Sequence, residues 1–246
     1  MLKRLLLFLS LLILLSGCVR YDVGIRFPQA NGGEIVQHVK LGQQLVNFSG
    51  EEVNEWLKSI EQRASSLNGR SKRLNDYELV VAIPFYNGKE LVEKFNEFFA
   101  SSPEPQKIPK KNPDYFNLSA RMNLEQNNWL FLERNVLEFE ADLTPLALVS
   151  KEGNIIISGE DLMDLRFKLN IPLLVKIAGE GVKWQKTGNQ EYEIRLSPGK
   201  INRIKAVFWV PNYVGLGTMA IIIFVSLGYY LKYKKMPLLE GTREGL

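Results

Sequence analysis

The chain has 246 residues, with 31 Lys and Arg against 27 Asp and Glu, one histidine and one cysteine. Six basic and two acidic residues lie in the terminal segments, so the part between them carries 25 charges of each sign. This balance gives no basis for nucleic-acid binding. A single cysteine also excludes an internal disulfide and a zinc site built from several thiolates.

Residues 1–17 predict a lipoprotein signal peptide. Lys3 and Arg4 form a positive start, and the apolar run from Leu5 to Leu15 is too short to span a bilayer. The run ends in Leu-Ser-Gly-Cys, which resembles the bacterial lipobox. We expect Cys18 to be acylated and the chain to be cut just before it. The alternative is a chance cysteine behind a plain signal or a short membrane anchor.

The next segment predicts two strands and a helix. Residues 21–27 and 32–41 read as strands around an Asn-Gly-Gly turn. Ser49 and Glu52 have the spacing of a capping box, which predicts that a helix begins there. Its apolar side chains recur at helical spacing and belong to Val53, Trp56, Leu57, Ile60, Ala64 and Leu67.

A third strand and a second helix follow. Residues 77–85 read as a strand, and Asn87 with Glu90 predicts the start of a helix that continues to Phe99. Residues 101–113 contain four prolines, which are incompatible with a helix or a central strand. We therefore expect a proline-rich surface loop there.

Beyond this loop the pattern favours strands alone, because apolar and polar residues alternate with a period of two. A turn is expected at Gln126-Asn127-Asn128. The expected strands cover residues 118–124, 137–143, 165–171, 181–185, 191–196 and 201–210. This order predicts an α+β domain in which a curved antiparallel sheet, open or barrel-like, packs against two helices.

Residues 210–231 predict a transmembrane helix, since no charged residue occurs from Ala206 to Leu231. Aromatic residues stand at both edges, as membrane interfaces favour. The lysines that follow predict a cytoplasmic tail over residues 232–246. A buried core helix is the alternative. If the segment spans the membrane, residues 18–209 form an extracytoplasmic domain that is attached to one membrane at both ends. We expect that membrane to be the bacterial plasma membrane, with the domain on its periplasmic side.

The sequence predicts no catalytic, metal-binding or cofactor-binding residue. His38 alternates with Val36 and Lys40, as on a surface or edge strand. Glu138, Glu140 and Asp142 share one strand face, which fits calcium or acid–base chemistry but equally an ordinary solvated face. We therefore expect no enzyme and no cofactor. Residues 215–220, "GLGTMA", match a loose form of the dinucleotide-binding motif. They lie inside the apolar segment and not at the start of a βαβ unit, so we do not interpret them as a nucleotide site.

The layout resembles a family of lipoproteins with an LppM-like domain, found in mycobacteria and in a cyanobacterial branch. The resemblance rests on "LSGC", followed by a strand hairpin and a helix. It also rests on "KLNIPLLVKIAGEGVKWQKTGNQEYEIRLSPGKINRIKAVFWVPN", residues 168–212, before one apolar helix. It implies a small α+β domain that contacts envelope lipids, with Cys18 as the lipidated residue. For a chain of the cyanobacterial branch, the thylakoid membrane is the alternative location, with the domain on its lumenal side.

These observations predict a membrane-anchored lipoprotein whose domain binds a lipid or amphipathic ligand at the membrane surface. The alternative is a scaffold or assembly factor that docks a membrane-protein complex. The expected partners are therefore membrane lipid or a membrane protein, and not nucleic acid.

Overall fold

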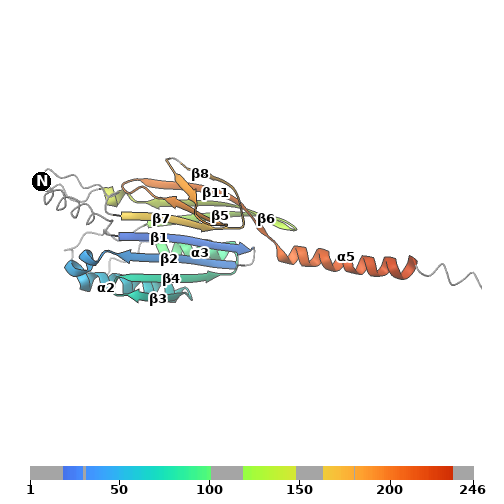
Figure 1. The fold of residues 1–246 in the computed structure, drawn as a ribbon, viewed down its shortest axis with the longest axis horizontal. Helices are drawn as coiled ribbons and strands as arrows, with labels where there is room; N and C mark the ends of the chain where they lie inside the picture. Colours follow the sequence, from blue (N-terminus) through green and yellow to red (C-terminus); the bar gives the residue numbers. More distant parts are fainter. Residues whose placement is uncertain (1–18, 30–31, 101–118, 148–162, 180, 235–246) are drawn as a thin grey trace, which may run out of the picture.

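The computed structural model describes residues 19–29, 32–100, 119–147, 163–179 and 181–234. These residues form an α+β fold with two sheets and a long C-terminal helix (Figure 1). The signal peptide, Cys18, the proline-rich segment at 101–113 and most of the tail lie outside the described residues.

The larger sheet has seven strands in the order β3-β4-β2-β1-β7-β10-β9. They are β1 (Val19–Gln29), β2 (Gly32–Leu41), β3 (Arg70–Asn75), β4 (Glu78–Phe85), β7 (Met163–Asn170), β9 (Lys183–Lys186) and β10 (Glu191–Arg195). Neighbouring strands are antiparallel except β1 and β7, which run parallel with Ile25 opposite Leu169.

The smaller sheet has four antiparallel strands in the order β5-β6-β11-β8. They are β5 (Ser119–Trp129), β6 (Leu132–Asp142), β8 (Leu173–Ala178) and β11 (Ile201–Pro211). A short 3₁₀ helix, η1 (Thr144–Ala147), follows β6. The predicted α+β fold, with antiparallel sheet packed against helices, is confirmed. Its strands divide between two open sheets, and none of the described strands closes a barrel.

Three α-helices complete the described fold: α2 (Gln43–Ser66), α3 (Gly88–Phe99) and α5 (Tyr213–Lys234). The predicted cap of α3 is confirmed, since the backbone N–H of Glu90 donates to Oδ1 of Asn87 at 2.8 Å. The predicted start of α2 is wrong. The helix begins at Gln43, six residues before Ser49, after an N-cap glycine that offers no side-chain acceptor.

Phenylalanines fill the space between the layers. The helices α2 and α3 cover β2, β3 and β4 on one face, and the four-stranded sheet packs over the neighbouring part of that face. Phe27 of β1 meets Phe208 of β11 with ring centroids 5.9 Å apart. Phe95 of α3 meets Phe139 of β6 at 6.0 Å. Trp56 is half-buried and packs against the same core.

The first strand begins at one end of the domain and the C-terminal helix leaves from the other (Figure 1). The β1 strand has 11 residues, which corresponds to about 35 Å of extended chain. It points toward the end at which β11 passes into α5. Val19, the first described residue, therefore lies at the end of the domain far from α5.

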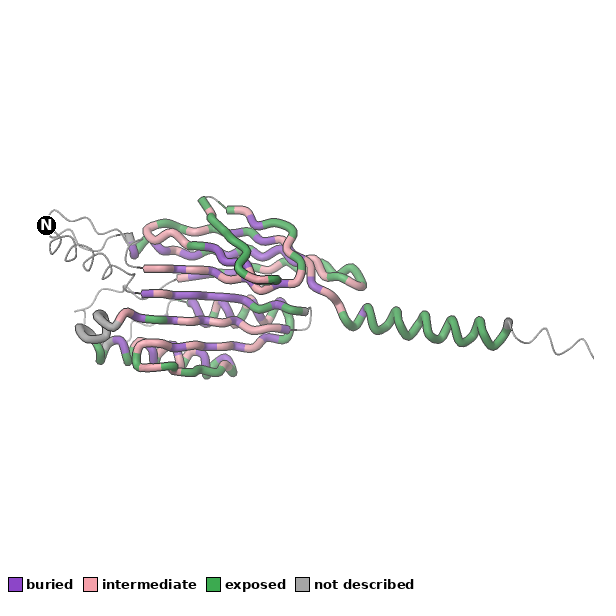
Figure 2. The backbone as a smooth tube through the Cα atoms, in the orientation of Figure 1, coloured by how far each residue is buried: buried purple, intermediate pink, exposed green. Residues whose placement is uncertain are grey.

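Beyond its first turn the C-terminal helix stands clear of the domain, and Figure 2 shows it exposed along nearly all of its length. Tyr213–Tyr233 has 21 residues, a mean hydropathy of 1.9 and only 6 % burial. It overlaps the predicted span 210–231, although residues 210 and 211 belong to β11. A helix in the core of a soluble domain would be mostly buried, so the alternative of a buried core helix does not hold.

Candidate functional site

The junction between the domain and α5 is the most distinctive region of the described structure. The helix begins with Asn212 as its cap, because Oδ1 of Asn212 accepts the backbone N–H groups of Val214 at 3.1 Å and Gly215 at 3.2 Å. The same residue reaches the hairpin formed by β5 and β6. Its backbone N–H donates to the carbonyl of Phe131 at 2.9 Å, and its Nδ2 donates to Oδ1 of Asn128 at 3.2 Å. Asn212 therefore joins the hairpin to the helix.

The tip of this hairpin consists of large apolar residues. Trp129 pairs with Leu132, so Leu130 and Phe131 form the connecting loop. Trp129 is 67 % exposed and Leu130 is 61 % exposed. The turn expected at residues 126–128 is wrong, because β5 continues through Gln126, Asn127 and Asn128 up to Trp129. We call residues 129–132 the hairpin tip.

The outer face of the four-stranded sheet changes character toward the hairpin tip. Far from α5 it carries the ion pairs Arg203–Glu140 and Lys205–Glu138, both at 2.7 Å. Nearer to α5 the rings of Trp209 and Trp129 meet edge to face, with centroids 6.3 Å apart. The Glu138–Lys205 pair lowers the pKa of Glu138, mainly through the hydrogen bond. The polar part of this face thus gives way to an aromatic part beside the helix.

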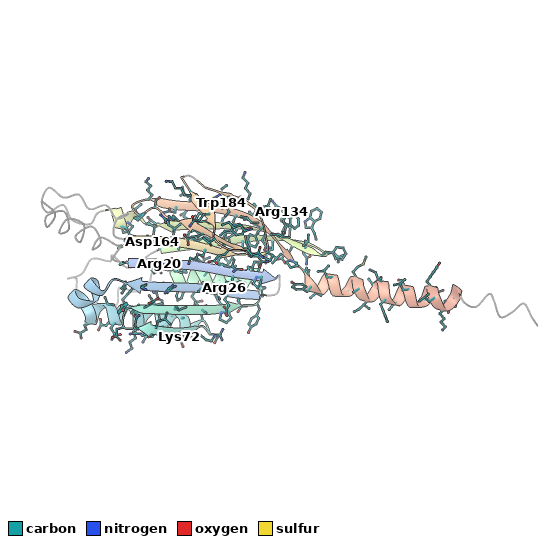
Figure 3. All side chains as sticks on the ribbon, in the orientation of Figure 1. Arg20, Arg26, Lys72, Arg134, Asp164 and Trp184 are labelled. Carbon is teal, nitrogen blue, oxygen red and sulfur yellow. The ribbon has the colours of Figure 1, made fainter. Side chains whose placement is uncertain are left out.

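Arg134 lies within the aromatic part of this face. It pairs with Trp209 of β11 on one side and with Asn127 of β5 on the other. Figure 3 labels it near the end of the domain from which α5 leaves. No acidic side chain among the described residues forms an ion pair with Arg134. Within the part of the chain that the structure describes, its cation therefore has no anionic partner.

The acidic residues singled out on β6 have separate partners. Glu138 and Glu140 pair with β11 as described, and Oδ1 of Asp142 accepts the backbone N–H and the hydroxyl of Thr144 at 3.0 and 2.6 Å. Within the described ranges there is no group of three or more Asp, Glu, His or Cys side chains that could hold a metal ion. This arrangement matches a solvated strand face.

A second surface feature is a polar depression on the other side of the molecule's larger sheet. No described helix or strand covers this face, where the side chains alternate with those of the core. The depression has a volume of about 230 Å³ and its lining includes Asp22, Gly24, Val36, His38, Lys168 and Glu191. We call it the polar depression.

Charges in and around the polar depression neutralise one another. Asp22 is only 4 % exposed and pairs with Arg20 at 3.2 Å and Lys168 at 3.0 Å. His38 lies on the open face with Val36 and Lys40, as expected, but on an interior strand and within 2.8 Å of Glu78. This hydrogen bond is the main cause that lowers the pKa of Glu78.

A small polar cluster lies inside the core, and nothing in the alternation pattern predicted it. Nε2 of Gln37 donates a short hydrogen bond to the hydroxyl of Tyr21, and burial raises the pKa of Tyr21. Arg63 of α2 donates to the carbonyl of Phe98 at 3.2 Å and lies over its ring. Burial lowers the pKa of Arg63. These groups lie among core side chains, so they are a structural feature of the interior.

Comparisons with known proteins identify a family but no activity. No curated protein matches the chain. A solved structure that it resembles is the folded domain of the Mycobacterium tuberculosis LppM protein, determined by NMR. The likeness has 14 % identity and a TM-score of 0.41, and it covers 80 % of this chain and 92 % of that domain. This likeness is to an LppM domain and points to no particular branch of that family.

The family model described as "Protein of unknown function (DUF3153)" matches residues 24–237, a range that contains both sheets, except for the start of β1 before Gly24, and the whole of α5. The chain therefore belongs to the DUF3153 family.

Proposed function

We propose that this protein is a non-catalytic membrane lipoprotein whose domain binds lipid at the surface of the membrane that α5 crosses. The observation that carries the proposal is the exposed apolar helix Tyr213–Tyr233, which continues directly from β11 and lies within the region matched by the family model. About 20 apolar residues are enough to span a bilayer. An exposed helix of this composition is costly in water and stable in lipid.

The proposal includes a second anchor at Cys18 and a domain on the outer side. The lipobox-like sequence supports acylation. Lys232 and Lys234 at the end of α5, with Lys235 after it, support a cytoplasmic tail. A single acyl chain gives only marginal membrane binding, whereas a spanning helix binds almost irreversibly. The helix would therefore hold the protein, and the lipid would restrict how the domain is oriented.

Lipid contact is proposed for the outer surface and not for an internal pocket. Phenylalanine rings bridge the two sheets and α3, with Phe139 and Phe167 stacked 4.2 Å apart. An acyl chain needs continuous apolar space, and these rings fill the centre of the layered domain. Trp129 and Tyr213 are instead exposed at the junction with α5.

The experiment removes each anchor in turn from the full chain expressed in a bacterium. Cys18→Ser should leave the protein in the membrane fraction after alkaline carbonate washing, because α5 remains. A chain that ends before Tyr213 but keeps Cys18 should be released in large part. Protease added to spheroplasts should digest the domain and spare the tail. Recovery of Cys18→Ser in the soluble fraction would contradict the proposed span.

A second candidate function is docking of a membrane protein on the open polar face. The uncovered polar depression, with Asp22 and Lys168 on neighbouring strands, favours it. A photo-crosslinking residue at Val36 should then give one discrete adduct in membranes, and the same residue at Arg121 on the other sheet should give none. Absence of an adduct from Val36 would count against docking there.

A further inference from the structure

The backbone of the hairpin tip is strained, which indicates that its side chains have a function other than stabilising the fold. Leu130 has a φ of +54°, a conformation that bulky side chains rarely adopt. Two-residue hairpin loops that need positive φ strongly prefer Asn or Gly. The chain has asparagines three and two residues earlier, inside β5, yet it places an exposed leucine at the strained position. Strain of this kind is typical of sites where the side chain has a function.

The hairpin tip is fixed against the first turn of α5. Asn212 bonds to Phe131 and Asn128, as described. Gly215 lies so close to the tip that an added Cβ would be 1.6 Å from the carbonyl oxygen of Leu130. The tip and the start of the helix therefore form one rigid unit. If the helix enters a membrane, the tip is carried to the same depth as its first turn.

The side chains around this unit have the chemistry of a membrane interface. Trp129, Trp209 and Tyr213 are amphipathic rings, of which Tyr213 is 56 % exposed. Such rings favour the boundary between headgroups and acyl chains. Leu130 adds an exposed apolar side chain. The guanidinium of Arg134, which forms no ion pair with any described side chain, adds a cation that suits a phosphate oxygen.

We propose that the hairpin tip inserts into the interfacial layer of the membrane, with Trp129 and Leu130 at the acyl boundary and Arg134 against headgroup phosphates. This inference rests on the proposed membrane function, since α5 is what brings the tip to the surface. The occupant of the exposed tip is then a phospholipid bilayer, because the tip is continuous with the segment that enters it. An apolar patch of another protein is the competing occupant.

The test measures the depth of single tryptophans in the full chain. The protein is reconstituted into phosphatidylcholine vesicles whose acyl chains carry bromine near the headgroup end, which quenches nearby tryptophan emission. One variant keeps only Trp129 and the other keeps only Trp184, with the remaining tryptophans changed to phenylalanine. Trp184 is the matched control, because it is also exposed but lies on β9 of the larger sheet.

We expect bromine to reduce the emission of Trp129 about twofold or more, since an interfacial side chain lies at that depth, and to leave Trp184 nearly unchanged. Equal quenching of both, or of neither, would overturn the inference. Flotation of the vesicles separates the two proposals. A chain that does not float contradicts the membrane function, whereas a chain that floats without quenching of Trp129 contradicts only insertion of the tip.

A second variant tests the tip without threatening the fold. Leu130→Asn suits the positive φ and removes the apolar side chain. In the chain that keeps only Trp129, it should reduce quenching while circular dichroism stays unchanged. In vesicles that contain phosphatidylglycerol as well as phosphatidylcholine, Arg134→Gln should lower the fraction of phosphatidylglycerol crosslinked to the protein, and Lys72→Gln on the edge strand β3 should not. Unchanged quenching in Leu130→Asn and unchanged lipid contact in Arg134→Gln would both contradict the inference.

Discussion

The ring of Phe139 on β6 stacks on the ring of Phe167 on β7, with centroids 4.2 Å apart and planes inclined by 15°. This contact joins the two sheets, which share no strand. Both residues are almost fully buried. The chain has a single cysteine and therefore no internal disulfide, so apolar packing between the sheets must provide much of the stability of this domain.

Phe139→Ala should therefore lower the free energy of unfolding by about 3–5 kcal/mol, the cost of a large cavity in a packed core. Phe139→Leu is the control and should cost much less, because most of the volume is kept. Chemical denaturation of the full chain in detergent micelles measures both. A loss below about 1 kcal/mol for the alanine variant would indicate that the space between the sheets is loosely filled or occupied by something else.

Gly215→Ala should disturb the junction, and Gly217→Ala should not. An added Cβ at position 215 overlaps the Leu130 carbonyl, whereas nothing lies within 4 Å of one added at position 217. We expect a loss of about 1–3 kcal/mol for the first change, typical of overpacking. The second should be neutral or slightly stabilising, since alanine favours helix. Thermal unfolding in micelles compares the two, and identical melting curves would show that helix and tip are not in contact.

Asn212→Ala should cost about 1 kcal/mol, because it removes the side-chain cap of α5. Asn212→Asp separates the cap from the link to β5. Aspartate keeps the acceptor for Val214 and Gly215 but loses the donor to Asn128. We expect the aspartate variant to keep the helix and to increase hydrogen exchange at the hairpin. The circular dichroism of α5 and the exchange of the Leu132 amide are the measurements, and a hairpin unaffected by either change would argue against the link.

Glu78 should make stability depend on pH in the acid range. The pKa of Glu78 lies below its ordinary value of 4.5, mainly because of the hydrogen bond with His38, with further contributions from Lys40 and Asn75. A carboxyl whose pKa is lower in the folded state stabilises the fold above its unfolded pKa. That contribution is lost as the pH falls through its folded pKa.

The stability difference between the wild type and Glu78→Gln should thus be largest near neutral pH and shrink below the ordinary pKa of 4.5. Urea denaturation at several pH values measures it. Glu97→Gln is the control, because Glu97 is exposed on α3 and forms no ion pair with any other described side chain. A difference for Glu78→Gln that does not change with pH would contradict the assigned contact.

Most of the helices and strands could be predicted from the sequence, because burial of one face of an element produces a periodic pattern of apolar residues. In β4 the residues Leu79, Val81, Ile83 and Phe85 all face the core, so the alternation was readable. The strands β3 and β8 were not predicted, for different reasons. The edge strand β3 is polar on both faces, and β8 exposes Leu173 and Val175, so neither shows a buried period.

The candidate site was predicted only in part. The aromatic residues before α5 were expected at a membrane edge from their composition. Their partner, the hairpin tip, was missed because turn chemistry pointed to Gln126-Asn127-Asn128, while the actual loop has Leu130 in an unfavourable conformation. The contact between Leu130 and Gly215 joins residues far apart in sequence, and no local pattern encodes it.

The direction of β1 determines how the domain is oriented on the membrane when both α5 and an acylated Cys18 anchor it. Val19 begins at the end of the domain opposite α5, about 35 Å of extended strand away. A protein held by α5 alone can stand upright on the bilayer with β1 pointing down at the lipid. An acyl chain on Cys18 reaches the same leaflet only when the long axis reclines along the surface. Acylation would then change the orientation of the domain, so that its long axis runs along the membrane and no longer away from it. This change would alter which face of the larger sheet is exposed to the surrounding compartment.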